Sequence, residues 1–183
     1  MILYPEVKDR LEDIERIQLI TQESGYRIIN KVGPLNNPAD RDHCLQYMVA
    51  IPLIYGNLVA DHYEDKIAAD PRIDRLRELM TCEEESVYSE DYLDPQKRSI
   101  ANAIQIHFKD GSSTEKVEIH YPVGHRNRRE EGIPLLVNKF TDSIRGALSS
   151  DKVEALLEIC ETQEKFASTD LDCMMRILRG SKL

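Results

Sequence analysis

Apolar residues recur at two spacings in the first half of the chain, and each spacing predicts one kind of element. A spacing of two over residues 14–21 predicts a strand with one apolar side. A spacing of three to four predicts a helix over 38–56, with Asn37 as its N-cap and Gly56 just past its end. A second helix, over 71–80, has a narrow apolar stripe, which is typical of a surface helix.

The clearest alternation lies further along and predicts a β-hairpin. Residues 100–108 and 114–121 both alternate apolar and polar positions, and Asp110-Gly111 between them is a typical turn. Because neighbouring side chains of a strand point to opposite faces, the hairpin should bury one face and expose the other. The face predicted to lie against the 38–56 helix carries Ile104, Ile106, Val117 and Ile119, and the face predicted to meet solvent carries Gln105, His107, Lys116, Glu118 and His120.

Beyond the hairpin the spacing becomes helical and stays so to the end. Two capping boxes predict helix starts there: Asp151 with Glu154, and Thr169 with Asp172. The sequence therefore predicts an α+β fold. Residues 1–140 would form a small antiparallel or mixed sheet with packed helices, and residues 141–183 a C-terminal helical tail.

The composition narrows the class of protein and its partners. The 183 residues contain 24 Lys and Arg against 33 Asp and Glu, so the net charge is −9 and nucleic acid is not an expected partner. No apolar run reaches the roughly 18 residues of a membrane helix, and the start of the chain has no secretion signal. With 41% hydrophobic and 31% charged residues, collagen, a coiled-coil rod and wholesale disorder are excluded.

The cysteines and histidines do not form a recognisable metal site. Cys44, Cys82, Cys160 and Cys173 are far apart and include no C-x-x-C pair. They are interpreted as reduced thiols, with a disulfide between the last two as the alternative. The two histidines of the hairpin's polar face lack a third ligand nearby. The sequence therefore predicts no metal and no cofactor.

The densest polar cluster lies at the start of the predicted 38–56 helix, where free backbone N–H groups favour anions. Asp40, His43 and Tyr47 are three and four residues apart, so one helix face could present an acid, an imidazole and a phenol. The positive helix end would favour a neutral His43, which could then accept a proton. A carboxylate ligand would suit this site.

A purely structural interpretation of the same cluster is also open. Asp40 would then be a helix cap and His43 a half-buried surface residue. Arg41 would be an ion-pair partner of Asp42 or Glu64.

Two further clusters each allow two interpretations. Residues 91–95 predict a turn, or else a loop that delivers Tyr92 to a site. Residues 124–129 form a basic patch after the hairpin, in which Arg126 and its neighbours could bind carboxylates. Alternatively, the two glutamates that follow this loop balance its charge.

Long strings around these clusters are shared with one protein family. The matching strings are 27–31, 33–48, 63–65, 91–98, 100–104, 121–125, 132–134 and 139–140. On these strings the chain resembles the MmgE/PrpD family, and within it the members that dehydrate 2-methylcitrate. The resemblance covers nearly the whole chain.

The resemblance implies a place within a larger subunit. Subunits of the family have a large helical domain, built from the N-terminal region and the last helices, and a smaller α+β domain inserted before those helices. Residues 1–140 resemble the small domain and residues 141–183 the closing helices. The N-terminal helical region is expected to lie outside the 183 residues.

The resemblance also implies an activity. The family's enzyme is a lyase that converts 2-methylcitrate to 2-methyl-cis-aconitate in the methylcitrate cycle of propionate catabolism, without an iron–sulfur cluster. In a related decarboxylase of cis-aconitate, an active-site histidine falls on His43 and an active-site tyrosine near Tyr92, with Tyr88 as the competitor. Dehydration needs a base and an acid, so His43 is expected to take one role and Tyr92 the other.

Charge chemistry completes the expected site. Arg41 and Arg126, with Asp40 beside them, are the candidates for binding the carboxylates of a small tricarboxylate substrate. Further active-site residues of the family belong to the region outside these 183 residues, so this stretch by itself is expected to be inactive. The alternatives are a non-catalytic fold or oligomerisation module, a small acid-binding domain, or a relative acting on citrate or cis-aconitate.

The helical tail and the chain end bear on assembly and location. The tail's apolar stripe exceeds what a small sheet can cover, which favours a homodimer. The resemblance implies the mitochondrial matrix in a eukaryote and the cytoplasm in a bacterium. The final Ser181-Lys182-Leu183 also matches a peroxisomal address.

Overall fold

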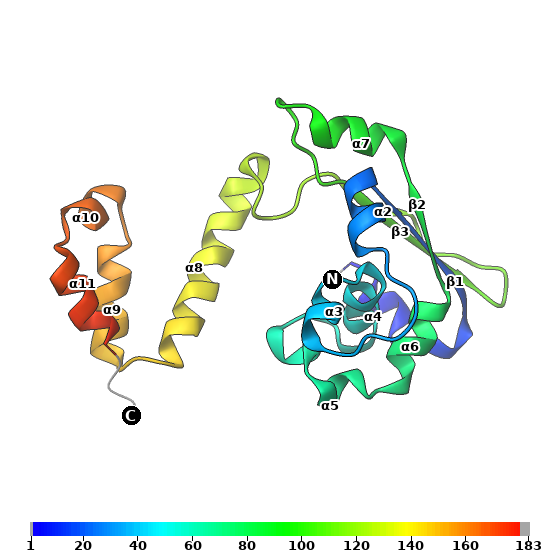
Figure 1. The fold of residues 1–183 in the computed structure, drawn as a ribbon, viewed down its shortest axis with the longest axis horizontal. Helices are drawn as coiled ribbons and strands as arrows, with labels where there is room; N and C mark the ends of the chain where they lie inside the picture. Colours follow the sequence, from blue (N-terminus) through cyan, green and yellow to red (C-terminus); the bar gives the residue numbers. More distant parts are fainter. Residues whose placement is uncertain (1, 180–183) are drawn as a thin grey trace. The chain divides into compact units, whose positions relative to one another are not determined.

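The structure is a computed structural model that describes residues 2–179, so the tripeptide at 181–183 lies outside the described residues. The chain divides into two compact units (Figure 1), unit 1 over Met1–Pro122 and unit 2 over Val123–Leu183. No helix within residues 2–179 is both long enough and apolar enough to cross a membrane.

The described part of unit 1 is built on a four-stranded mixed sheet in the order β2-β1-β3-β4. The strands are β1 (Ile14–Thr21), β2 (Met80–Glu84), β3 (Asn102–Phe108) and β4 (Val117–Ile119). β1 pairs parallel with β2 and antiparallel with β3, and β3 pairs antiparallel with β4. The predicted α+β fold with a mixed sheet, the 14–21 strand and the hairpin are confirmed, whereas β2 was not predicted.

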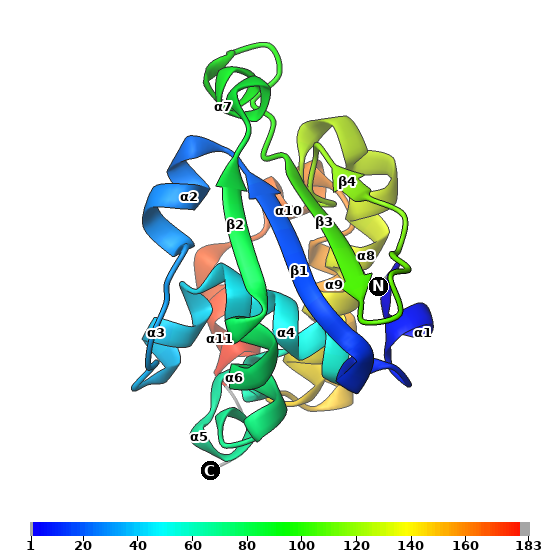
Figure 2. The ribbon, with the colours of Figure 1, turned by 90° about the vertical axis from the view of Figure 1, so that its right-hand side faces the viewer.

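The helices of unit 1 pack on one face of this sheet, apart from α7, which lies beyond one end of it (Figure 2). They are α1 (Tyr4–Val7), η1 (Leu11–Asp13), α2 (Glu23–Ile29), α3 (Pro38–Asp42), α4 (Leu45–Tyr55), η2 (Ala60–Tyr63), α5 (Asp65–Ala68), α6 (Pro71–Glu78) and α7 (Ser86–Leu93). α4 passes behind the sheet, and α6 packs on α4. The main core is a cluster in which Ile17, Ile51, Ile73 and Ile106 are fully buried.

The helix predicted over 38–56 is in fact two helices, α3 and α4. Its predicted ends are right, because the Asn37 side chain accepts from the Asp40 N–H at 2.9 Å and Gly56 is left-handed with φ 81°. Between them, His43 ends α3 and the extended Cys44 begins α4. The apolar stripe begins only at the fully buried Cys44. Burial of apolar side chains therefore stabilises α4, whereas α3 is stabilised by its N-cap, Asn37.

The predicted faces of the hairpin are largely confirmed. Ile106 is fully buried, and Ile104 and Val117 pack against the core, while Lys116, Glu118 and His120 are exposed. Gln105 and His107, which were also predicted to meet solvent, are only partly exposed. Ile119 was predicted to be buried and is 40% exposed, since the covered face ends at Val117 two residues earlier. Tyr88 of α7 packs on Ala101 and Ala103, whose side chains alternate with those of Ile104 and Ile106 and so lie on the other face of the hairpin.

Two segments differ from the expected local structure. Residues 91–93 form the last turn of α7 rather than an isolated turn, and the break comes at Asp94, whose carboxylate accepts from the Gln96 N–H. The helix predicted over 71–80 ends at Glu78, because Met80 already pairs with Ile17 at the start of β2. A local turn at Asp94 therefore ends α7, whereas a long-range strand pairing decides where α6 ends.

Unit 2 is helical in its described residues, as predicted. It contains η3 (Arg126–Arg128), α8 (Arg129–Arg145), α9 (Ser150–Ile159), α10 (Gln163–Ser168) and α11 (Leu171–Leu178). The caps of α9 and α11 are Ser149 and Asp170, not the predicted Asp151 and Thr169. Residue 140 lies inside α8, so the compact division comes earlier in the chain than 140. The assignment of 1–140 and 141–183 to the two domains of the family stays a prediction.

Candidate functional site around His43

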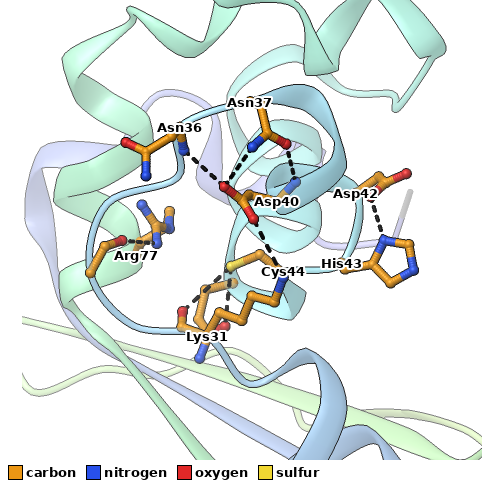
Figure 3. Close-up of polar contacts among 10 residues, drawn as sticks. Lys31, Asn36, Asn37, Asp40, Asp42, His43, Cys44 and Arg77 are labelled. Carbon is orange, nitrogen blue, oxygen red and sulfur yellow. Dashed lines mark hydrogen bonds and ion pairs between the residues drawn. The ribbon is translucent and has the colours of Figure 1, made fainter.

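His43 presents an oriented imidazole at the end of α3. Its side chain is 62% exposed, and its Nδ1 lies 2.5 Å from Oδ1 of Asp42 (Figure 3). An ionised carboxylate only accepts hydrogen bonds, so Nδ1 donates, and a neutral ring keeps an acceptor lone pair on Nε2. The pair can therefore act as a proton acceptor whose ring is held by a neighbouring carboxylate.

Asp40 organises the loop that precedes α3. Its Oδ2 accepts from the Asn36 N–H at 3.1 Å and from the Asn37 amide at 3.0 Å. Its Oδ1 lies 3.9 Å from the Lys31 ammonium. These contacts are structural, although the N-cap of α3 is Asn37 and not Asp40, and the role of Asp40 toward a substrate stays a prediction.

Tyr47 does not join Asp40 and His43 on one helix face. It is 2% exposed, and its hydroxyl donates to the His62 carbonyl at 2.7 Å, while burial raises its pKa. The predicted shared face is therefore wrong, because the chain breaks between the two helices. The positive electrostatic field expected at the helix N-terminus is also weak, since α3 is only five residues long.

Arg41 is the most buried of the residues predicted to bind the substrate's carboxylates. Its side chain is 6% exposed, donates from Nη1 to the Tyr63 carbonyl at 2.6 Å, and pairs through Nη2 with Asp65 at 2.7 Å. The ion-pair partner is thus Asp65 rather than Asp42 or Glu64. With these contacts Arg41 holds the segment after α4 against α3.

A residue that was not predicted, Lys31, lies against this cluster. Its carbonyl accepts from the Cys44 thiol at 3.5 Å, and the buried Gln46 amide donates to the Asn30 side chain at 2.5 Å. The backbone at 30–31 is therefore fixed to the start of α4, beside His43. A single lysine before a Gly-Pro turn carries no sequence pattern that distinguishes it, so sequence reasoning could not find it.

The predicted tyrosine lies on another element. Tyr92 is partly exposed in the last turn of α7, while Tyr88 is buried, and both burial and the nearby Glu118 raise the Tyr88 pKa. Both views of the ribbon place α7 beyond one end of the sheet, well away from α3 (Figures 1 and 2). Unit 1 alone therefore does not bring Tyr92 to His43.

The remaining candidates lie in unit 2 or concern metals. Arg126 is exposed in η3, and its neighbour Arg128 pairs with Glu131 at 2.5 Å, as the charge-balanced interpretation predicts. The four cysteines are free thiols. Within residues 2–179, no three His, Cys, Asp or Glu side chains are grouped so that they could hold a metal ion.

Comparison with known proteins identifies the family. Residues 1–165 match the model of the MmgE/PrpD C-terminal domain. The mitochondrial 2-methylcitrate dehydratase of Yarrowia lipolytica is 50% identical over 175 residues, which are 94% of this chain and 33% of that protein. The 2-methylcitrate dehydratase of Escherichia coli K12 is 52% identical over 147 residues, which are 80% of this chain and 30% of that protein.

The chain spans about a third of the length of the curated relatives that it matches. An identity of about 50% over most of the chain is much higher than that of proteins that share only a fold. The chain belongs to the MmgE/PrpD family and carries its C-terminal domain.

Proposed function

We propose that the chain is the C-terminal portion of a 2-methylcitrate dehydratase, a hydro-lyase that forms 2-methyl-cis-aconitate in propionate catabolism without an iron–sulfur cluster. About half of the aligned positions are identical to those of relatives named 2-methylcitrate dehydratase, which supports the choice of substrate. The Asp42–His43 pair is the observation that supports the chemistry, because it supplies an oriented proton acceptor in a small α+β unit.

In the proposed reaction, Nε2 of His43 takes a proton from the carbon next to a substrate carboxylate. The C–H electron pair forms the double bond, and the C–O bond of the neighbouring hydroxyl breaks. That hydroxyl leaves as water after it receives a proton from an acid, a role we assign to Tyr92. Since unit 1 keeps His43 and Tyr92 apart, the two would act in one site only if a second surface or subunit completes it.

We also propose that the working assembly is a homodimer that binds a small tricarboxylate through Arg41, Asp40 and Arg126. The exposed apolar side chains of unit 2 support the dimer. For its location we propose the mitochondrial matrix in a eukaryote or the cytoplasm in a bacterium. The first of these rests on the printed name of the Yarrowia lipolytica relative.

A chimera tests the proposal. The segment of the Escherichia coli enzyme that matches this chain is replaced by the chain itself, and the conjugated product is followed by its ultraviolet absorbance. We expect dehydration of 2-methylcitrate at a rate within roughly tenfold of the parent, with citrate assayed in parallel. A folded chimera without dehydratase activity would show that the proposed function is wrong.

A matched pair of variants tests His43 in that chimera. We expect His43→Ala to lower kcat by about 10²-fold or more with the fold intact. The control is His120→Ala, because His120 is likewise an exposed imidazole beside a carboxylate, with its Nε2 3.0 Å from Glu118. Equal rates for the two variants would remove His43 from the mechanism.

The 183 residues on their own should turn over little or no 2-methylcitrate. The reason is the separation of His43 from Tyr92 in unit 1. Steady-state turnover by the purified chain, at a rate comparable to the chimera, would contradict this expectation.

A further inference from the structure

β4 is an edge strand of unit 1, in which β3 is its neighbour within the described sheet (Figure 2). Ile106 of β3 donates its N–H to the Thr114 hydroxyl at 3.1 Å and accepts from the Thr114 N–H at 2.9 Å, so its backbone groups point to the side of β4. Alternate residues of a strand point their backbone groups to the same side, so those of Ile104 and of its partner Val117 point toward each other. The backbone N–H and C=O groups of the residues that flank Val117 therefore point outward, to the edge of the sheet.

An apolar groove of about 340 Å³ lies beside this edge. Ile104 and Val117 line it from the sheet, and α4 contributes Met48 and Leu53. No charged side chain of the described residues lines the groove. Val117 is only partly buried, and Ile119, two residues further on the same face of β4, is 40% exposed. The edge therefore offers apolar surface that a further strand would cover.

The other face of β4 carries side chains of opposite charge. The Lys116 ammonium lies 3.5 Å from the Glu118 carboxylate, which lies 3.0 Å from the His120 ring. All three residues are exposed, so these contacts are weak and can be shared with further charged groups. Charges on an edge strand usually oppose pairing with another chain. On β4 they oppose or favour pairing according to the register, because their signs differ.

One antiparallel register between two copies of β4 matches these charges. Backbone hydrogen bonds form between residues that both point outward, which here are Lys116 and Glu118. A register centred on either of them sets like charges opposite each other, which is destabilising. A register centred on Val117 sets Lys116 of each copy opposite Glu118 of the other. It also places the two Val117 side chains next to each other at the apolar groove.

The opposite edge of the sheet is less suited to a second copy. β2 forms that edge and leads directly into Glu85, so residues 83–85 are three glutamates in a row. Two copies paired through β2 would bring these acidic runs close together, and like charges oppose association. The comparison favours β4 as the edge that meets a second copy.

We propose that β4 pairs antiparallel with β4 of a second copy of the chain, with Val117 opposite Val117, so that the two sheets join into one. The outward backbone groups, the opposite charges and the apolar groove all find a complement in this register. The contact is small and is therefore weak when taken alone. It lies in unit 1, is separate from the dimer contact proposed for unit 2, and does not depend on the proposed dehydratase activity.

A disulfide cross-link tests the register. Val117→Cys is introduced into the 183-residue chain together with Cys160→Ser and Cys173→Ser, which remove the free thiols of unit 2. Opposite residues of antiparallel strands lie close enough for a disulfide, so mild oxidation at about 0.1 mM protein should link roughly half of the chains or more.

The matched control for the cross-link is Ile119→Cys in the same background. Ile119 lies on the same face and strand and is exposed, so its thiol would be accessible. In the proposed register its two copies are about 13 Å apart along the strands, which is too far for a disulfide, so cross-linking should be roughly tenfold lower. Equal cross-linking at the two positions, or none at Val117→Cys, would overturn the proposal.

Exchange of the two charges tests their complementarity. In the Val117→Cys chain, Glu118→Lys sets like charges opposite each other on both sides of Val117, so the cross-linking rate should fall about fivefold or more. Lys116→Glu should have the same effect for the same reason. The double variant restores opposite charges and should return the rate to within about twofold of the starting value. A double variant as slow as the single ones would contradict the register.

Amide hydrogen exchange tests the contact without any substitution, and so remains available if Val117→Cys does not fold. The N–H groups of Lys116 and Glu118 should exchange about threefold or more slowly at about 1 mM protein than at about 10 μM, because they donate across the contact. The Val117 N–H, which points to β3, is the internal control and should change less. Exchange at Lys116 and Glu118 that does not depend on protein concentration would overturn the proposal.

Discussion

Unit 1 and unit 2 bury their apolar residues to very different extents. In unit 1, side chains from β1, β3, α4 and α6 meet in one core. In unit 2, the buried cluster consists of Leu148, Val153 and Leu156, and α8 has no buried residue among those described. Yet α8 carries apolar residues at helical spacing, of which Ile133 and Leu136 are 54% and 65% exposed.

The difference shows which part of the chain can stabilise itself. Burial of an apolar side chain contributes roughly 1.5–3 kcal/mol to the free energy of unfolding, and the side chains of unit 1 are buried against one another. The amphipathic α8 gains it only when another surface covers its apolar side. We therefore expect substitutions in the two units to have effects of different size and of different kind.

The largest difference is expected for truncation of apolar side chains. Phe108→Ala in unit 1 should lower the free energy of unfolding by about 3–5 kcal/mol, because Phe108 is 1% exposed at the centre of the core. Leu136→Ala in α8 should change it by less than about 0.5 kcal/mol. Urea unfolding followed by circular dichroism measures both. Equal losses would mean that Leu136 is already buried against another surface.

A second substitution tests what covers α8. If the chain is a homodimer through unit 2, the double variant Leu136→Gln with Val137→Gln should weaken dimerisation by about tenfold or more in sedimentation. The thermal midpoint of unit 1 should stay the same. Lys139→Gln, at an exposed position of the same helix, is the control. A strictly monomeric wild-type chain would refute the dimer.

Acid should act mainly on unit 1. In it, the forked Arg72 guanidinium and the Tyr55 hydroxyl hold the pKa of Asp70 well below its usual range, and the Asp70 side chain is 16% exposed. A lowered pKa in the folded state stabilises the fold above about pH 4, and this contribution is lost as the pH falls toward the folded-state value.

Asp70→Asn should therefore cost about 1–2 kcal/mol near pH 6, and less and less below about pH 4. Thermal melts of both proteins between pH 2 and 7 measure the convergence. Asp151→Asn in unit 2 is the comparison, because the pKa of Asp151 is also lowered, by Ser149, but at a fully exposed position. A cost of Asp70→Asn that does not change with pH would contradict this account.

Helix caps should give the smallest effects. Asn37→Ala removes the acceptor for the Asp40 N–H in unit 1, and Asp170→Ala the acceptor for the Cys173 N–H in unit 2. Each should cost about 0.5–1 kcal/mol. Asn37→Ala should appear in the cooperative transition of unit 1, whereas Asp170→Ala should lower only the helicity of α11. Helical circular dichroism and near-ultraviolet melts separate the two responses.

The sequence predicted those elements whose structure is determined by residues close to them along the chain. The 14–21 strand and the hairpin alternate strongly, and Asn37 and Gly56 mark helix ends by their own chemistry. β2 was missed because Met80–Glu84 is a short, acidic edge strand directly after a helix, and its partner β1 is about sixty residues away. The break at His43 comes directly before Cys44, which is buried and contacts the Lys31 carbonyl, and no periodicity reveals either feature.

The same limit applies to the candidate site. Asp42 and His43 are adjacent, so their pairing could be expected from sequence. The contacts of Lys31 with Asp40 and with Cys44 join segments that meet only in the fold. Burial of Arg41 against Asp65 follows from the turn after α4, which likewise has no local signature.

The position of β1 has a consequence for how the protein is made. β1 lies between β2 and β3, and its partners follow it by about sixty and about ninety residues. At a synthesis rate of roughly 5–20 residues per second, β1 waits several seconds or more for the strand that completes its pairing. During that time Ile17 and Leu19 have only β2 to pair with, so a nascent chain stalled before Phe108 leaves the ribosome should bind chaperones and aggregate, while one stalled after Pro122 has left it should not.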